Sequence, residues 1–363
     1  MTKPHLGPGI TMPIVMTGPV CGECFCSAIA MRSMRWWLDE HLPKGKRSMS
    51  LAHRETGLIR VAPSSGLRRS LARTADFVAL MKPRVMSLVV FTALVGLTIA
   101  PGPPDAGRSV IALLCIAAGA GGAAALNMWY DADVDAVMTR TAQRPIPSGR
   151  VSRTEALLFG LMLAICAVVA LSLIANIVAA TLLAFTILFY VVIYTAWLKR
   201  RTPQNIVIGG AAGALPPVIG WAAATGQVTV QPLLLFLIIF LWTPAHFWAL
   251  SLNHAGEYAR AGIPMLPVVA GRAETKKQIL IYTVLLLPIS ATPWILGFAG
   301  ALYGVTTAIT GATMTLLALR LHRSTRVAEA GAAGRLFAFS IIYLFVQFGS
   351  LLVDAAARYD QAS

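Results

Sequence analysis

The sequence has few charged residues for its length. Only 12% of its 363 residues are Asp, Glu, Lys or Arg, whereas a soluble domain carries about a quarter. The hydrophobic share is 57%, the mean hydropathy is +0.70, and apolar runs recur. These runs reach roughly 20 residues, the length of helix that crosses a bilayer core. The shortage of charge excludes an ordinary soluble domain and predicts an all-α membrane protein with several spans.

Cysteine is scarce as well, with five residues in the whole chain. Cys21, Cys24 and Cys26 form CGECFC, which superficially suggests a metal site, but no fourth ligand stands at a suitable spacing. Cys115 and Cys166 lie in apolar stretches and are interpreted as packing residues. The sequence therefore indicates no disulfide framework.

The first 75 residues differ from the rest. Residues 9–31 are mildly apolar but contain Pro13, Pro19 and Glu23, so we expect neither a spanning helix nor a signal peptide there. We interpret residues 1–75 as a basic, disordered cytoplasmic extension, or as sequence upstream of an internal start such as Met49. Residues 76–355 would form the membrane domain, and 356–363 a short C-terminal tail.

Apolar runs that are separated by polar residues or by Gly and Pro predict nine spanning helices. They lie near residues 85–101, 109–130, 156–174, 178–197, 207–224, 232–252, 278–299, 302–320 and 336–353. If the N-terminus is cytoplasmic, 28 of the 30 Lys and Arg face the cytoplasm, and only Arg108 and Arg358 do not. This is the positive-inside bias, so the net charge of +15 reflects topology. Anionic lipid is a sufficient partner for such a surface, and nucleic acid need not be invoked.

Acidic residues number only 15, yet three fall within five positions in the string NMWYDADVDAVMTRTAQRP. Asn127, Asp131 and Asp135 are four apart and share one face if the helix continues past Tyr130. Asp133 would point away and be solvated. Three oxygen-bearing side chains on one stripe suit Mg²⁺, with waters and phosphate oxygens completing the octahedron. An acidic loop that balances nearby arginines is the alternative.

Cations follow on the same side of the membrane. Arg140 and Arg144 come directly after the acids, and Lys199, Arg200 and Arg201 occupy the next inner loop. The planar guanidinium group of arginine can donate two hydrogen bonds to one phosphate. Mg²⁺ together with arginine neutralises the charge of a diphosphate. The alternative interpretation is that these cations only fix the orientation of the chain in the membrane, as the positive-inside bias requires.

The third inner loop carries a second polar pair. Asn253 and Glu257 are again four apart, and His246 lies in a helix of mostly apolar residues. A lone His in such a helix is more often a hydrogen-bonded interior residue than a ligand. Together the three loops predict a diphosphate–Mg²⁺ site at the cytoplasmic mouth of the bundle. A diphosphate whose apolar tail is buried between helices would be a polyprenyl diphosphate.

These motifs resemble a known family. NMWYDADVDAVMTRTAQRPIPSGR resembles the first aspartate-rich motif of the UbiA intramembrane prenyltransferase superfamily. LKRRTPQNIVIGGAAGALPPVIGW and FLWTPAHFWALSLNHAGEYARAGIPMLPVV are similar to the branch that farnesylates protohaem IX. KPRVMSLVVFTALVG is similar to the entry into the first helix of that branch. The resemblance spans roughly residues 76–355.

The resemblance implies nine helices bundled around a central cavity, with the active site on the cytoplasmic side of a bacterial inner membrane. It implies Mg²⁺-dependent transfer of farnesyl from farnesyl diphosphate to a vinyl group of haem B. The product would be haem O for haem–copper oxidase assembly, and haem A synthase is a candidate for receiving it.

The resemblance also assigns roles to residues. It implies metal ligands at Asn127, Asp131, Asp135, Asn253 and Glu257, and diphosphate-binding cations at Arg140, Arg144, Lys199 and Arg200. Asp131, Asp135 and Lys199 would be catalytic, and His246 would contact the haem. The superfamily usually has two aspartates where this chain has Asn253 and Glu257, and many relatives carry an acid at the position of Met128. The number of bound metals is therefore left open.

Two alternatives remain at this stage. The first is another UbiA-type aromatic prenyltransferase, which acts on a quinone precursor or a chlorin. The second is a cation-coupled transporter, which places ionisable groups near the midplane within related repeats. Here the acids cluster at one membrane face and no convincing repeat is found, which favours the enzyme.

Overall fold

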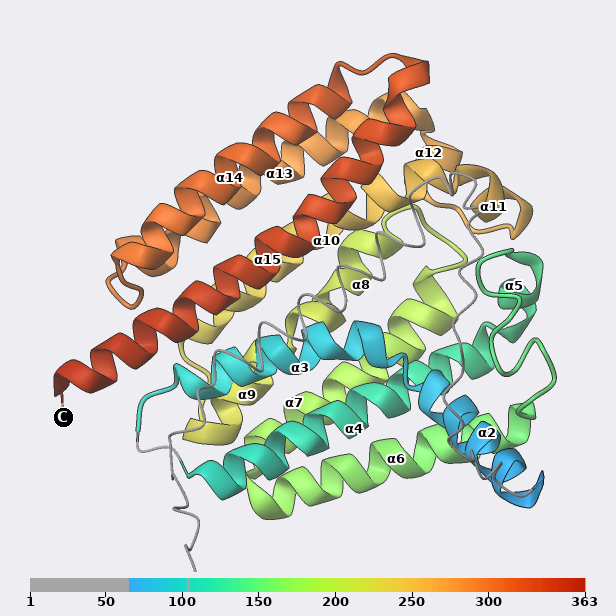
Figure 1. The fold of residues 1–363 in the computed structure, drawn as a ribbon, viewed down its shortest axis with the longest axis horizontal. Coiled ribbons are helices and arrows are strands. Elements are labelled where there is room, and N and C mark those ends of the chain that lie inside the picture. The colour runs from blue at the N-terminus through green and yellow to red at the C-terminus, as the bar shows by residue number, and fades with distance from the viewer. Residues whose placement is uncertain (1–64, 103–104, 363) are drawn as a thin grey trace, which may run out of the picture. The chain divides into compact units, whose positions relative to one another are not determined.

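The computed structural model describes residues 65–102 and 105–362, and within them the regular structure is entirely helical (Figure 1). The helices are α2 (Ser65–Leu80), α3 (Pro83–Thr98), α4 (Ala106–Tyr130), α5 (Ala132–Val137), α6 (Arg153–Ile174), α7 (Ile177–Leu188), the π-helix η1 (Phe189–Leu198), α8 (Asn205–Ala214), α9 (Pro216–Thr225), α10 (Val230–Asn253), α11 (Ala255–Arg260), α12 (Leu266–Val269), α13 (Gly271–Ile295), α14 (Ala301–His322) and α15 (Arg326–Ala362).

The predicted fold class, an all-α protein with about nine membrane spans, is confirmed. Eight helices of the described chain are long and apolar enough to cross a membrane, and the bent pair α2 and α3 makes nine. The seventh and ninth spans were expected to begin at residues 278 and 336, but their helices begin at Gly271 and Arg326. Hydropathy detects only the apolar part of a helix, so it misses first turns that carry Lys and Arg.

Both ends of the membrane domain differ from the expected boundaries. Helix α2 starts inside the segment expected to be disordered, and Phe77 packs edge-on against Phe159 of α6 at 5.1 Å. Ion pairs of Asp76 with Arg150 and of Arg73 with Glu155 hold the same helix. At the other end, α15 continues to Ala362 through the expected tail. The cysteines of CGECFC lie outside the described residues.

A sharp bend separates α2 from α3. The two axes meet at 52°, and the linking residue Lys82 has φ 52°, in the left-handed region. Pro83 follows it, and proline disfavours right-handed helical geometry in the residue before it. The left-handed backbone conformation is unfavourable for a non-glycine residue, and residues in such conformations cluster at functional sites.

Glycine allows α3 and α9 to pack with their backbones in contact. A Cβ built on Gly220 would lie 2.0 Å from the carbonyl oxygen of Ala93, and one on Gly96 would lie 2.0 Å from that of Pro217. Small residues at such contacts are the usual means by which membrane helices approach closely.

We therefore expect Gly220→Ala to destabilise the bundle. The added methyl group must push backbone away, because a carbonyl oxygen cannot rotate aside, and overpacking of this kind costs about 1–3 kcal/mol. Unfolding in mixed detergent micelles measures the change. Gly213→Ala is the matched control, because a Cβ there meets nothing within 4 Å. Equal stability of the two variants would contradict the close approach of α3 and α9.

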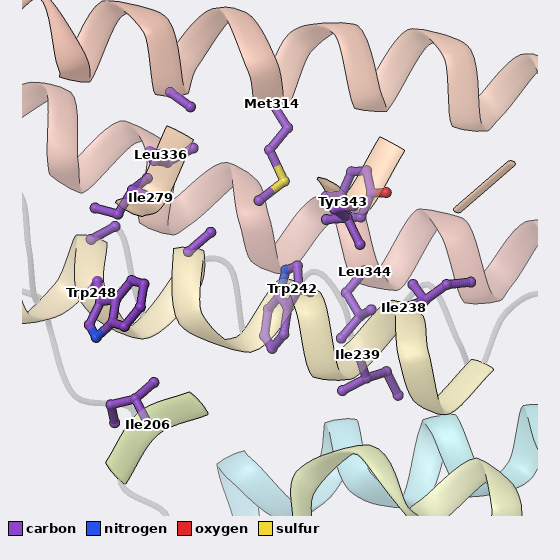
Figure 2. Close-up of a cluster of buried hydrophobic side chains, with 14 of the residues drawn as sticks. Ile206, Ile238, Ile239, Trp242, Trp248, Ile279, Met314, Leu336, Tyr343 and Leu344 are labelled. Atoms are coloured by element: carbon purple, nitrogen blue, oxygen red, sulfur yellow. The ribbon is translucent and has the colours of Figure 1, made fainter. Parts of the chain in front are cut away.

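The largest buried core surrounds α10. Figure 2 shows Trp242 and Trp248 of this helix, with Met314 of α14 and Leu336 of α15 on one side of α10 and Ile206 of α8 on the other. The indole Nε1 of Trp242 donates to the carbonyl oxygen of Ser340 at 2.8 Å, which ties α10 to α15. This core fixes the C-terminal half of α10, where the second polar motif begins.

The alternation of spans brings the chemically distinctive loops to one side of the membrane. The ends of α4, η1, α10 and α14 all face the same side, as do the beginnings of α6, α8, α13 and α15, because two spans separate each of these turns from the next. In Figure 1, α5, α11 and α12 gather at one end of the bundle. The polar groups of three different loops therefore share this end.

Candidate diphosphate and metal site

The helix that carries the first motif is interrupted at Asp131. Helix α4 ends at Tyr130 and α5 begins at Ala132, but the backbone amides of Asp131 and Asp135 still bond to the carbonyls four residues earlier, at 3.0 and 2.8 Å. The spacing expected for a continuous helix is therefore preserved across the break. Asn127, Asp131 and Asp135 are all buried, with exposed fractions of 4%, 0% and 3%.

Asp131 lies at the centre of a cluster of polar side chains. Its Oδ2 accepts from Lys199 Nζ at 2.5 Å and from Asn127 Nδ2 at 2.9 Å. Its Oδ1 has no hydrogen-bond partner, and Arg200 Nη2 lies 3.6 Å from it. A wholly buried carboxylate oxygen without a partner is costly, and such atoms typically mark a position for an ion or ligand.

The π-helix η1 positions Lys199, the residue that follows it, within this cluster. The amide of Lys199 bonds to the carbonyl of Tyr194 at 2.8 Å, five residues back instead of four. A wider turn rotates the residues that follow it, so it changes where the last side chains of the helix point. Stretches of π-helix occur frequently at functional sites.

Two residues that were not predicted from the sequence, Thr195 and Lys82, hold Asn127. Thr195 of η1 is 0% exposed, and its Oγ1 accepts from Asn127 Nδ2 at 3.0 Å. Lys82, at the bend between α2 and α3, donates to Asn127 Oδ1 at 2.6 Å. Lys82 lies within the string KPRVMSLVVFTALVG, but nothing in its spacing indicated a contact with Asn127.

The two arginines after the acids are placed differently. Arg144 Nη1 donates to both oxygens of Asp135, at 2.9 and 2.7 Å, and is half-buried. Arg140 is exposed and makes no hydrogen bond or ion pair within the described chain. Arg144 therefore joins the cluster, while Arg140 does not.

Asp133 points away from the cluster, as its spacing indicated, but it is paired. Its side chain is 57% exposed, and its two oxygens accept from the Arg200 guanidinium at 2.8 Å each. The hydrogen bonds from Arg200 lower the pKa of Asp133 to about 2. Because the folded pKa is depressed, the pair keeps its contribution at neutral pH and loses it only as the pH falls toward 2.

The second motif does not continue one helix as expected. Helix α10 ends at Asn253, His254 breaks it, and Glu257 lies in α11. Asn253 is exposed and donates to the carbonyl of Ala330, whereas Glu257 Oε1 lies 3.3 Å from His254 Nδ1. The other oxygen, Glu257 Oε2, is buried and has no partner.

A pocket lies between α5 and the end of α11. It has a volume of about 320 Å³ and is lined by three residues of α5, by Arg200, and by residues 260–263 at and after the end of α11. Arg260, at the end of α11, contributes an exposed cation that has no ion-pair partner in the described part of the chain. Arg260 was not among the residues predicted from the sequence, although it lies three residues after Glu257 in the same motif.

His246 lies deep in α10, apart from these loops. It is 8% exposed, its ring stacks on Trp242 and Phe337 at 4.3 and 4.6 Å, and its Nδ1 is 2.7 Å from Ser340 Oγ. This is the hydrogen-bonded interior environment that a lone histidine usually occupies.

The donor set fits a hard divalent cation bound together with a ligand. Asp131 Oδ1 and Glu257 Oε2 are buried carboxylate oxygens without partners, and oxygen is what Mg²⁺ prefers. Among the described residues, no three of His, Cys, Asp and Glu gather closely enough to hold an ion alone. Lys199, which pairs with Asp131, and Arg144, which pairs with Asp135, would be free to bind an anionic ligand once a metal replaced them.

Loss of the Thr195 hydroxyl tests the support of Asn127. In Thr195→Val the Asn127 amide loses one acceptor in a buried site, a change that costs about 1–3 kcal/mol and corresponds to roughly 10-fold or more in rate if the amide is used in the reaction. Thr195→Ser keeps the hydroxyl and should retain turnover near the wild-type level. Equal turnover in the Val and Ser variants would show that the contact is only structural.

Comparison with known proteins gives a consistent result. Residues 89–342 match the UbiA prenyltransferase family. The chain is 60% identical over 292 residues, 80% of its length and 93% of the relative's, to the protoheme IX farnesyltransferase of Rhodopseudomonas palustris strain BisB5. It is 59% identical over 280 residues, 77% and 88% of the two chains, to the protein of the same name from Parvibaculum lavamentivorans.

Solved structures share the fold at low identity. A digeranylgeranylglyceryl phosphate synthase structure superposes with a TM-score of 0.66 at 19% identity, covering 79% of this chain and 99% of the other. A UbiA homologue from Archaeoglobus fulgidus bound to GPP and Mg²⁺ gives a TM-score of 0.53 at 15% identity, covering 76% and 99%. At these identities the likeness concerns the fold alone.

Proposed function

The chain belongs to the UbiA prenyltransferase family, and on that premise we propose that it transfers farnesyl from farnesyl diphosphate to a vinyl group of haem B, giving haem O. The assignment of haem B as the acceptor rests on the 60% identity to protoheme IX farnesyltransferase across 80% of the chain. The fold alone would not separate this acceptor from a quinone precursor, since distant relatives share it. A transporter is not favoured, because the buried acids gather at one membrane face.

The proposed reaction needs a departing diphosphate to be stabilised. Mg²⁺, when bound, neutralises charge on the leaving group. We assign its ligands to Asn127, Asp131 and Asp135, with Glu257 and Asn253 on the opposite loop. The partnerless oxygens of Asp131 and Glu257 support the assignments of these two residues most directly.

The cations of the site would bind the diphosphate itself. Lys199 and Arg144 lie closest to the acids, and Arg200 and Arg260 line the adjoining pocket. As the bond from farnesyl C1 to oxygen breaks, these side chains hold the growing negative charge. The vinyl π electrons of haem attack C1, and water then adds to the resulting cation and loses a proton to give the hydroxyethylfarnesyl group.

The location follows from the same assignment. The chain is a multi-pass membrane protein, and we propose that it lies in a bacterial inner membrane with the site facing the cytoplasm. The distribution of Lys and Arg supports this orientation. His246 is proposed to contact haem through Nε2, and haem A synthase is the proposed recipient of the product.

The function is tested by direct product analysis. Purified protein in membranes is incubated with haem B, farnesyl diphosphate and Mg²⁺, and the extracted haem is analysed by mass spectrometry. We expect haem O, and we expect its formation to stop with EDTA and resume when excess Mg²⁺ is restored. Unchanged haem B together with prenylated 4-hydroxybenzoate in a parallel sample would replace the proposed acceptor with a quinone precursor.

A further inference from the structure

A second basic pocket lies outside the candidate site, where α13 and α15 begin. It has a volume of about 290 Å³ and is lined by Arg272, Ala273, Lys276, Ser324, Arg326 and Glu329. None of these residues takes part in the cluster around Asp131. The turn between α14 and α15 lies on the same side of the membrane as the start of α13, so the pocket opens at the same membrane face as the candidate site.

A buried acid organises two of the cations. Glu329 is 3% exposed, and Arg272 forms an ion pair with its Oε1. Lys276 Nζ stands 3.4 Å from Oε2 and donates to the carbonyl of Ser324 at 3.0 Å. The carboxylate is thus used to position Arg272 and Lys276, and its charge is already compensated.

The remaining charge of the pocket is positive. Three cations face one carboxylate, and the third cation, Arg326, is exposed with no ion pair or hydrogen bond to any described side chain. Glu274, the other nearby acid, binds Gln278 and Lys277 and does not line the pocket. The first turns of α13 and α15 add the positive ends of two long helices, which favour anions.

We propose that this pocket binds a phosphate group, with Arg326 and Lys276 as its principal contacts. A volume of about 290 Å³ exceeds what one phosphate needs and leaves room for part of a glycerol-phosphate head group. Two sources supply this chemistry at a membrane surface. One is the phosphodiester of an anionic phospholipid, and the other is a soluble phosphate or diphosphate.

Native mass spectrometry of the detergent-purified chain tests the proposal. Bound phosphatidylglycerol is counted against phosphatidylcholine of the same acyl length, with and without millimolar inorganic phosphate or diphosphate. Arg326→Gln removes the unpartnered cation and is not expected to disturb folding. Arg323→Gln is the matched control, because Arg323 is an exposed arginine of the same turn that does not line the pocket.

We expect Arg326→Gln to weaken phosphatidylglycerol binding about 10-fold, the usual effect of losing a charge-assisted hydrogen bond, and Arg323→Gln to leave it unchanged. Displacement of the lipid by phosphate or diphosphate would identify a soluble ligand, and resistance to displacement would identify the lipid. Equal binding in Arg326→Gln and wild type, or equal loss in both variants, would overturn the proposal. Farnesyl transfer in detergent should be unaffected by Arg326→Gln, so failure here is distinguishable from failure of the proposed function.

Discussion

Replacement of Asp131 by Asn should reduce prenyl transfer by about 10²–10³-fold, the scale seen when a principal electrostatic contact to a transition state is lost. Asp131 is wholly buried, binds Lys199 through Oδ2 and leaves Oδ1 without a partner. Asn keeps the shape and one oxygen but removes the charge that attracts a divalent cation. Initial rates of haem O formation at saturating farnesyl diphosphate measure the effect.

Asp133→Asn is the matched control for this prediction. It lies two residues away, is 57% exposed, and its pairing with Arg200 lies at the surface, where ion pairs contribute about 1 kcal/mol or less. Its turnover should stay within a few-fold of the wild type. Comparable losses in the two variants, with both proteins folded, would mean that total loop charge matters and not the buried position.

Replacement of Arg144 by Gln should give the largest loss of stability among the site variants. Both oxygens of Asp135, which is 3% exposed, are held by this guanidinium. Without it a buried carboxylate remains unpaired, which costs roughly 3 kcal/mol. Unfolding in mixed micelles measures this loss, and activity should fall at the same time because the Asp135 carboxylate is then free to reorient.

Arg140→Gln provides the comparison, because Arg140 is exposed and unpaired in the described chain. Its unfolding free energy should equal that of the wild type. The double variant Arg144→Gln with Asp135→Asn should recover part of the lost stability, since the unpaired charge is then gone. Additive losses in the double variant would contradict a direct interaction between the two side chains.

The fold could be predicted because the signal is long and repeated. Each span is an apolar run near the length that a bilayer demands, and the loops carry nearly all the cations on one side. The start of α2 could not be predicted in this way, because a short helix that includes Arg73 and Asp76 shows no sustained hydrophobicity. Its ion pairs and aromatic contact arise only from tertiary packing.

Parts of the site depend on backbone geometry that residue spacing does not encode. A spacing of four predicts a shared face only for an α-helix, so the π-helix that positions Thr195 and Lys199 was not visible in the sequence. The break at His254 likewise separates Asn253 from Glu257, although their spacing matches that of Asp131 and Asp135. The first motif keeps its face because its backbone hydrogen bonds continue across Asp131.

Sequence spacing also did not distinguish the two arginines of the first loop. Arg140 and Arg144 both follow the acids closely, and only the turn from Met138 to Arg150 decides which reaches Asp135. The amide and hydroxyl bonds of this turn, such as Thr141 Oγ1 to the carbonyl of Asp135 at 2.9 Å, set that choice. Such local hydrogen bonds follow from the folded backbone and from no simple periodicity.

The central claim is that the buried end of α4 holds a divalent cation together with a prenyl diphosphate. Electron paramagnetic resonance of Mn²⁺, a spectroscopic substitute for Mg²⁺, tests it with farnesyl thiolodiphosphate, whose carbon–sulfur bond resists cleavage. We predict that the wild type and Asp133→Asn bind Mn²⁺ only when the analogue is present, and that Asp131→Asn does not bind it. Undiminished, analogue-dependent Mn²⁺ binding by folded Asp131→Asn would contradict the account.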